Sequence, residues 1–195
     1  MPSSQVLIVN GSPRRHGNTS WLINRVVDSF HQKGVGSKIV SAVALRSLNN
    51  GCTGCHGCQK SHDFLCVFKD DVQPLVASMP EYRCIIFATP VYFFGPTAQL
   101  KLVIDRMFSL IKSKNDKYVH PFSPTTKIGV IMATGGDEND GCDLVIDMFQ
   151  RIGGILGIVP ETLVMPLAPL TPEAIDDPDD WRRQAAAFCD KLLGK

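Results

Sequence analysis

The feature that most constrains the fold of this sequence is a regular alternation of short apolar segments and amphipathic helical segments. Apolar runs of strand length recur five times, and a helical pattern follows each one, directly or after a loop. The predicted strands are residues 5–10, 38–43, 83–88, 127–133 and 162–165. Such alternation predicts a parallel sheet with helices on both faces and right-handed crossovers.

Five strands of this kind favour an α/β three-layer sandwich with the flavodoxin-like strand order 2-1-3-4-5. A six-stranded dinucleotide fold fits less well. The chain has no internal repeat and no long linker, so we expect residues 1–195 to form a single domain, with a cysteine-rich loop at 51–66. Ligands of such sheets bind at the carboxyl ends of the strands. The loops after the first, third and fourth strands therefore carry the functional prediction.

Composition excludes several classes of partner. The formal net charge is +1, and no basic stripe indicates nucleic-acid binding. The longest apolar run, CIIFATPVYFFG, is too short to cross a membrane and is interrupted by Pro90. The first residues, MPSSQVLIVNGS, lack the basic region of a signal peptide. Seven cysteines in such a chain point to a reducing compartment, so we expect a cytoplasmic protein.

The loop after the first strand, NGSPRRHGNTS at residues 10–20, has the chemistry of a phosphate site. It matches neither a Walker A loop nor GxGxxG. It offers hydroxyls, an amide and two cations at a helix N-terminus, where free N–H groups favour anions. These groups are Ser12, Arg14, Arg15, Asn18, Thr19 and Ser20. A terminal phosphate monoester suits them, and the alternative is a solvated turn before a helix capped by Asn18 or Thr19.

The loops after the third and fourth strands suit a flat ligand. Residues 89–95, TPVYFFG, place three aromatic side chains at the end of a strand, where a planar ring or neighbouring protein would cover them. Residues 133–137, ATGGD, carry paired glycines that let a backbone approach a ligand closely. A phosphate pocket at one end and aromatic walls at the other describe flavin mononucleotide (FMN).

Three motifs in this order resemble the NADPH-dependent FMN reductase family of flavodoxin-like proteins: GSPRRHGNTSWL, TPVYFFGPTAQLKLVIDR and ATGG. The resemblance runs from the first strand to the fourth helix. It implies that Ser12, Arg14, Asn18 and Thr19 bind the FMN phosphate. It further implies that the isoalloxazine is bordered by Pro90, Val91, Tyr92, Phe93 and Gly95, with Thr134 and Gly135 on its other side. The family is usually dimeric or tetrameric, with FMN near a subunit interface.

The segment GCTGCHGCQKSHDFLC, residues 51–66, resembles the iron–sulfur flavoprotein branch of that family. That branch binds a [4Fe–4S] cluster through a C-x2-C-x2-C-x4–7-C motif, which Cys52, Cys55, Cys58 and Cys66 match. The last gap, seven residues with bulky Phe64, leaves open whether Cys66 reaches the cluster.

Chemistry favours the same assignment. Two-residue gaps let one glycine-rich loop supply three thiolates, and evenly spaced cysteines favour a cluster over zinc. A zinc site with His56 or His62 and a loop of free thiols are the alternatives. Cys84, Cys142 and Cys189 fall in regular elements and are expected to be buried apolar residues.

The predicted function is that of an FMN-dependent oxidoreductase. Electrons would come from NADPH, NADH or a reduced carrier and pass to a small-molecule or protein acceptor, with the cluster as a relay. The alternatives are a cluster-free quinone, nitro- or azo-compound reductase, and a non-enzymatic electron carrier or redox sensor. No side-chain pair demands a catalytic role, so no catalytic residue is assigned. Leu102 and Leu110 fall off the apolar stripe of the third helix, so we expect them to be exposed and to form a subunit contact in a homodimer or homotetramer. The alternative is that these leucines cover the edge of the protein's own core.

Overall fold

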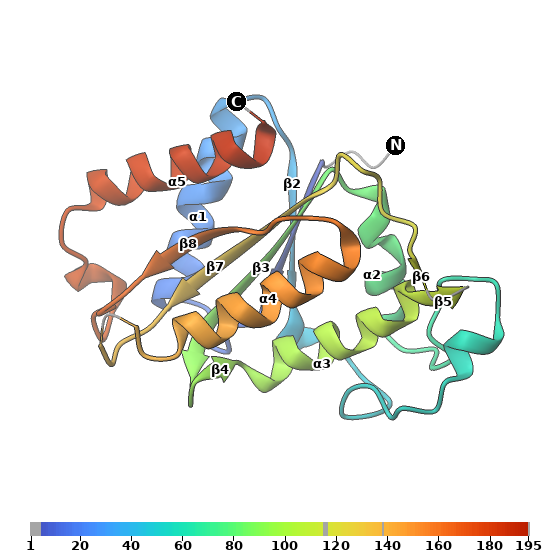
Figure 1. Ribbon diagram of the computed structural model, residues 1–195. Coiled ribbons are helices and arrows are strands. Elements are labelled where there is room, and N and C mark those ends of the chain that lie inside the picture. The colour runs from blue at the N-terminus through green and yellow to red at the C-terminus, as the bar shows by residue number, and fades with distance from the viewer. Residues whose placement is uncertain (1–4, 115–116, 138, 195) are drawn as a thin grey trace.

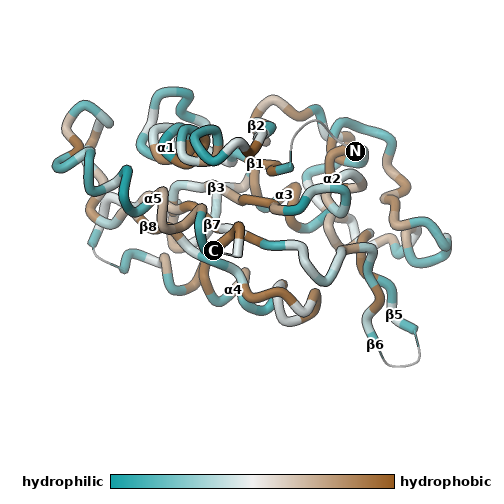
Figure 2. Tube along the Cα trace, turned by 90° about the horizontal axis from the view of Figure 1, so that it is seen from above, coloured by the Kyte–Doolittle hydropathy of each residue, from teal (hydrophilic) through white to brown (hydrophobic). Residues whose placement is uncertain are grey.

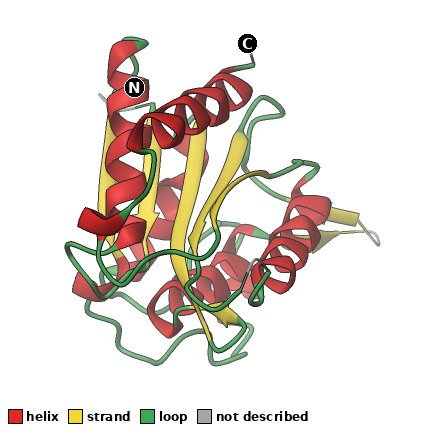
Figure 3. Ribbon diagram, turned by 90° about the vertical axis from the view of Figure 1, so that its left-hand side faces the viewer, coloured by secondary structure: helices red, strands yellow, loops and turns green. Residues whose placement is uncertain are grey.

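The computed structural model describes residues 5–114, 117–137 and 139–194, and it has a central sheet covered by helices on both faces (Figure 1, Figure 3). Five parallel strands lie in the order β2-β1-β3-β7-β8. Their bounds are β1 Val6–Asn10, β2 Ser37–Ser41, β3 Cys84–Tyr92, β7 Lys127–Ala133 and β8 Glu161–Met165. A two-residue strand, β4 Gly95–Pro96, pairs antiparallel with the end of β3. The flavodoxin-like order predicted for the five main strands is confirmed.

The two faces of the sheet bury two separate sets of apolar side chains. Alternate residues of β1 point to opposite faces, with Ile8 in the core under α1 and α5 and Leu7 in the core under α2, α3 and α4. The central strands β1, β3 and β7 are apolar over most of their length because both of their faces are covered, whereas the edge strand β2 is half-exposed or exposed. The helices are α1 Asn18–Gln32, α2 Val72–Ser78, α3 Ala98–Arg106, α4 Cys142–Leu156 and α5 Pro178–Leu193. None of the described helices is both long enough and apolar enough to cross a membrane.

Short elements fill the connections. The 3₁₀ segments are η1 Ala42–Ala44, η2 Gly57–Lys60, η3 Met79–Glu81, η4 Met107–Leu110 and η5 Pro172–Ala174. A hairpin of β5 Lys112–Lys114 and β6 Lys117–Val119 projects from the body of the molecule (Figure 2). This hairpin was not predicted, because its strands are short, lysine-rich and half-exposed or exposed, so they lack the apolar pattern of a core strand.

Two helix predictions were wrong. The α-helical part of α3 ends at Arg106 and continues as η4, whose three residues per turn rotate later side chains away from the 3.6-residue stripe. Leu110 is therefore 1% exposed, Leu102 packs against the core, and Phe108 is exposed. The expectation of exposed leucines was wrong. The glycine pair Gly153 and Gly154 in the sequence predicts the end of the fourth helix, but α4 runs to Leu156, and Gly157 ends it at a φ of 65°.

Candidate functional site

The loop between β1 and α1 lies at the carboxyl edge of the sheet. Ser12 and Thr19 are buried there, and the Asn10 side chain accepts a hydrogen bond from the Ser12 N–H at 2.9 Å. The first turn of α1 contains no acidic residue, and within the described residues its N-cap, Gly17, makes no side-chain cap. The expected capping by Asn18 or Thr19 was wrong, since the Asn18 Nδ2 donates to the Pro169 carbonyl at 2.6 Å. The helix N-terminus therefore carries no carboxylate that would compete with an anion.

A chain of buried hydrogen bonds joins this loop to β3 and α3. The Gly11 N–H donates to the Ala88 carbonyl at 2.7 Å, and Thr97 Oγ1 donates to the Gly11 carbonyl at 2.8 Å. The Thr97 N–H donates to Thr89 Oγ1 at 3.0 Å, and Thr97 Oγ1 accepts from the Leu100 N–H at the start of α3. Buried hydrogen bonds of this kind fix the relative position of the loops.

The loops after β7 and β8 are tied together in the same way. The Ala168 N–H donates to the Thr134 carbonyl at 2.6 Å, and the Thr134 N–H donates to the Met165 carbonyl at 3.0 Å. Thr134 Oγ1 and the Gly136 N–H both donate to Asp140 Oδ2, at 2.8 and 3.0 Å. These contacts place the loop after β8 beside the first loop, where Pro169 meets Asn18.

The loops enclose a cavity of about 180 Å³. Nine of the eleven residues predicted to bind the flavin line it: Ser12, Arg14, Asn18, Thr19, Pro90, Val91, Tyr92, Thr134 and Gly135. Phe93 and Gly95 do not. The sequence interpretation missed Ala168, Pro169 and Leu170, which also line the cavity. The topology rule that selected the other loops would have found them, because the loop after the fifth strand lies at the same edge.

Phe93 and Phe94 form an aromatic turn between β3 and β4. Both have positive φ, 46° and 66°, in a two-residue hairpin turn of the kind that normally favours Asn-Gly. A bulky side chain in this left-handed region is strained. Phe93 is 97% exposed and Phe94 is 55% exposed, beside the mouth of the cavity at Tyr92.

The cysteine segment forms a second site, at the other end of α3. Cys52, Cys55, Cys58 and Cys66 line one cavity of about 20 Å³, together with Arg106 and Phe108. All four are free thiols; Cys58 is buried, Cys66 half-buried and the other two exposed. Gly51 and Gly54 have φ of 104° and 66°, so this loop uses backbone conformations that other residues rarely adopt.

Comparisons with known proteins identify the family of the chain. The profile of the family described as NADPH-dependent FMN reductase matches residues 4–166. The chain belongs to the NADPH-dependent FMN reductase family. It is 32% identical over 147 residues to an iron–sulfur flavoprotein of Methanocaldococcus jannaschii, covering 75% of this chain and 70% of that protein. It is 28% identical over 152 residues to an iron–sulfur flavoprotein of Archaeoglobus fulgidus, covering 78% and 72%.

Solved structures confirm the fold of this FMN reductase family member. An FMN-dependent NADH-azoreductase from Bacillus anthracis, solved in complex with FMN, superposes with a TM-score of 0.67 over 98% of both chains. Its sequence identity is 12%, so this likeness concerns the fold alone. Family membership makes the protein an oxidoreductase and supports FMN as its cofactor.

The thiols of this family member fall into two chemical classes. Burial raises the pKa of Cys84 to about 12 and that of Cys189 to about 11, so both stay protonated near neutral pH. The pKa of Cys55 is lowered, chiefly by a hydrogen bond from the Gly57 backbone and then by one from Thr53. Thiolate is the form that binds metals and reacts, so Cys55 is chemically more reactive than Cys84 and Cys189.

The donor set of the loop fits a cluster. Four free thiols face one cavity between glycines at positive φ. In the described part of the chain, no three His, Cys, Asp or Glu side chains lie close enough together to hold a metal ion.

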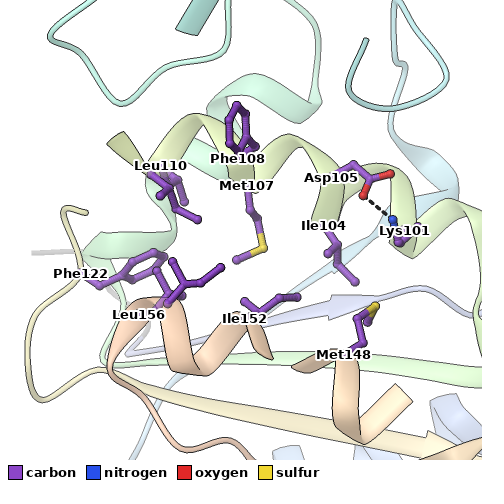
Figure 4. Close-up of a pocket in the computed structure, with 12 residues that line it drawn as sticks. Lys101, Ile104, Asp105, Met107, Phe108, Leu110, Phe122, Met148, Ile152 and Leu156 are labelled. Atoms are coloured by element: carbon purple, nitrogen blue, oxygen red, sulfur yellow. Dashed lines mark hydrogen bonds and ion pairs between the residues drawn. The ribbon is translucent and has the colours of Figure 1, made fainter. Parts of the chain in front are cut away.

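An apolar cleft of about 290 Å³ lies between α3 and α4 and contains none of the predicted site residues. Figure 4 shows Met107, Phe122 and Ile152 pointing into it, with the Lys101–Asp105 ion pair at one end. Phe108 points to the opposite side of η4, where it lines the cysteine cavity (Figure 4). Apart from that ion pair the cleft is lined by apolar side chains, which distinguishes it from the polar cavity at the strand ends.

Proposed function

We propose that the cavity at the strand ends holds FMN and that the protein transfers electrons from NAD(P)H or a reduced carrier to an acceptor. The observation that carries this proposal is the convergence of a carboxylate-free helix N-terminus, Arg14 and two buried hydroxyls with the end of β3 in one cavity. Ser12, Arg14, Asn18 and Thr19 would hold the phosphate. Pro90, Val91, Tyr92, Thr134 and Gly135 would border the ring, with Phe93 and Gly95 at its outer margin.

The flavin supplies the redox chemistry, and the residues of this chain bind and orient it. The Arg14 guanidinium would offset the phosphate charge, and the hydroxyl and amide groups would hydrogen-bond its oxygens. The buried Thr89–Thr97–Gly11 hydrogen bonds hold the loop in place. The same site suits a quinone, nitro- or azo-compound reductase and an electron carrier, which differ only in the acceptor.

We also propose that Cys52, Cys55, Cys58 and Cys66 hold a [4Fe–4S] cluster. Support comes from their common cavity, the lowered pKa of Cys55 and the iron–sulfur flavoproteins among the relatives. The cluster would provide one-electron transfer, which flavins also perform, and so would let a two-electron donor serve a one-electron acceptor.

A dimer or larger homo-oligomer is part of the proposal. The cavity of about 180 Å³ is smaller than the roughly 300–1,000 Å³ that enclose whole ligands, so much of the ring would lie outside it. The exposed aromatic turn of Phe93 and Phe94 stands at that side, and a second subunit could cover both. Light scattering at micromolar concentration tests this, and a monomer with FMN fully bound would contradict it.

The deciding experiment is purification without oxygen from iron-replete cells, followed by analysis of flavin, iron, sulfide and zinc. We expect one FMN with about four irons and four sulfides per chain. One zinc without iron would contradict the cluster and leave the flavin proposal standing. NADPH oxidation that requires a quinone would indicate a quinone reductase. Reduction by ferredoxin without any NAD(P)H oxidation would indicate a carrier.

A further inference from the structure

The cysteine loop is closed at its base by residues from both of its ends. The Arg46 N–H donates to Asp71 Oδ2 at 2.9 Å, and the Asp71 N–H returns a bond to the Arg46 carbonyl at 3.1 Å. The Leu48 N–H donates to Asp70 Oδ2 at 3.0 Å. Asp70 also accepts from the first N–H groups of α2, those of Val72 and Gln73. One carboxylate thus joins the entry of the loop, its exit and the start of a helix.

Arg106, at the C-terminal end of α3, holds that carboxylate. Its guanidinium donates to both oxygens of Asp70, at 3.0 and 3.1 Å, and to the Phe68 carbonyl at 3.2 Å. The side chains are buried, 1% exposed for Arg106 and 3% for Asp70. A two-pronged guanidinium–carboxylate contact of this kind is geometrically specific. The loop is therefore fastened to the body of the protein at one charged point.

The same guanidinium faces the cysteines. Arg106 lines the cavity formed by the four thiols, and its Nε is buried without a hydrogen-bond partner among the described residues. Burial opposes the charge of Arg106, but its hydrogen bonds to Asp70 outweigh this effect and raise the pKa of the group. An unpartnered buried donor is costly unless something in the cavity accepts from it.

A thiolate-bound cluster would be such an acceptor. Its net charge is negative and becomes more negative when it takes up an electron, and charge and hydrogen bonds at the sulfurs set its reduction potential. A fixed positive charge in a buried site stabilises the reduced form more than the oxidised form. Asp70 offsets part of this effect, because its negative charge lies on the far side of the guanidinium.

We propose that Arg106 is a positioning residue for the cysteine site: it holds Cys66 toward the bound centre, and its charge raises the reduction potential of that centre. The negative charge of Asp70 lowers the reduction potential, and Asp70 helps Arg106 to hold the loop in place. This inference rests on the proposed cluster. The inference goes beyond the proposed cluster because it assigns a role to two residues that are not ligands. The rival explanation is that Arg106 only holds the loop in place and has no electrostatic effect on the centre.

The two explanations predict different signs. If Arg106 acts through its charge, Arg106→Gln lowers the cluster potential and Asp70→Asn raises it. Arg106→Lys, which keeps the charge and loses the two-pronged geometry, stays near wild type in potential and loses part of its iron. If Arg106 only holds the loop in place, all three variants should lose iron, and the reduction potential of the remaining cluster should not change.

The test is a redox titration of anaerobically reconstituted protein. The titration is monitored by visible absorption and by electron paramagnetic resonance of the cluster, and iron and FMN are measured on each sample. The matched control is Arg151→Gln, which removes an exposed arginine paired with Asp147 on α4 and should change neither potential nor iron content. If Arg106→Gln does not fold, the sign of the shift in Asp70→Asn decides.

Opposite shifts in Arg106→Gln and Asp70→Asn support the inference, as does a raised potential in Asp70→Asn alone. Shifts of the same sign, or none, overturn it while leaving the cluster in place. Wild-type protein that holds FMN but no iron after reconstitution overturns both the cluster proposal and this inference, so the two failures are distinguishable.

Discussion

The two sites of this protein are built in opposite ways. The cavity proposed to hold FMN, called the flavin cavity below, is formed by loops at the ends of β1, β3, β7 and β8, so the sheet positions its walls. The cysteine cavity is formed by a loop outside the three layers, attached through the Arg106–Asp70 ion pair and a few side-chain hydrogen bonds. The first site is shaped by the core, whereas the second is held in place by a few polar contacts.

Helix α3 connects the two sites. Thr97 at its N-cap bonds to Gly11 at the flavin cavity, and Arg106 at its other end lines the cysteine cavity. Figure 1 shows α3 running from β4 toward the cysteine loop. Nine helical residues span roughly 14 Å at 1.5 Å each. Because the two sites lie at opposite ends of α3, the FMN content and the iron content can each be measured after a substitution at either site.

The largest expected effect follows from removing a cluster ligand. Replacing any one of Cys52, Cys55, Cys58 or Cys66 with Ser should abolish most of the bound iron, because the loop has no other thiol to substitute. FMN content should stay at wild-type level, since the flavin cavity is built from other elements. Iron, sulfide and flavin analysis after anaerobic purification measures both. Cys142→Ala is the control and should keep the iron; equal iron in the loop variants would contradict the assignment.

The second largest expected effect is a loss in the free energy of unfolding. Asp70→Ala leaves the buried Arg106 charge unpaired, and breaking such a pair costs about 3–5 kcal/mol in unfolding free energy. Urea unfolding measures this, with Asp147→Ala on the exposed pair of α4 as control, where the change should be about 0–1 kcal/mol. A small loss in Asp70→Ala would show that the loop is not held by this pair.

The stability from Asp70 should also depend on pH. Burial raises the pKa of this carboxyl, but the hydrogen bond from Arg106 and those from Leu48 and Gln73 outweigh it, so the pKa in the folded protein lies below its ordinary value. The contribution is therefore complete above the unfolded pKa of about 3.9 and is lost as pH falls through the folded pKa. The difference between wild type and Asp70→Ala should be constant near neutral pH and shrink below about pH 4.

At the flavin site, Arg14→Ala and Thr19→Ala should each weaken FMN binding by about 1–3 kcal/mol, the range for hydrogen bonds to a charged group. Fluorescence titration of apoprotein with FMN measures this, and riboflavin is the matched ligand because it lacks the phosphate. Wild type should bind riboflavin much less well than FMN, and the two variants should bind riboflavin as wild type does. Equal affinity for both ligands in wild type would refute the phosphate site.

The sequence predicted what the periodic core determines and missed what tertiary contacts determine. The strand at Lys127–Ala133 was predicted with its observed bounds, and the strand order is confirmed, because buried parallel strands read as continuous apolar runs. The end of α3 was not predicted, since the change to 3₁₀ geometry at Met107 depends on packing. The Arg106–Asp70 pair joins residues 36 apart, and no local pattern indicates it.

The rigidity of the flavin cavity can be tested at Gly11. A Cβ there would lie 2.6 Å from Leu100 Cβ and 2.9 Å from Thr97 Oγ1, so Gly11→Ala forces packed groups apart and should cost about 1–3 kcal/mol in unfolding free energy. The control is Gly154→Ala inside α4, where nothing lies within 4 Å and alanine should stabilise by about 0.5–1 kcal/mol. Opposite signs support a cavity fixed by packing, and a neutral Gly11→Ala would contradict it.

The smallest expected effect concerns the aromatic turn of Phe93 and Phe94. This turn resembles the cysteine loop because it is exposed and contains residues with positive φ. Replacing Phe93 and Phe94 with Asn and Gly should raise the unfolding free energy by about 1 kcal/mol, because these residues adopt left-handed backbone at low cost. The same change removes the apolar surface proposed for the subunit contact, so light scattering should show weaker self-association. Tyr118→Asn, which removes an exposed aromatic side chain from β6, is the control and should leave assembly unchanged. A more stable variant that still assembles like wild type would place the subunit contact elsewhere, and a less stable one would show that the two phenylalanines are held by contacts stronger than the strain they carry.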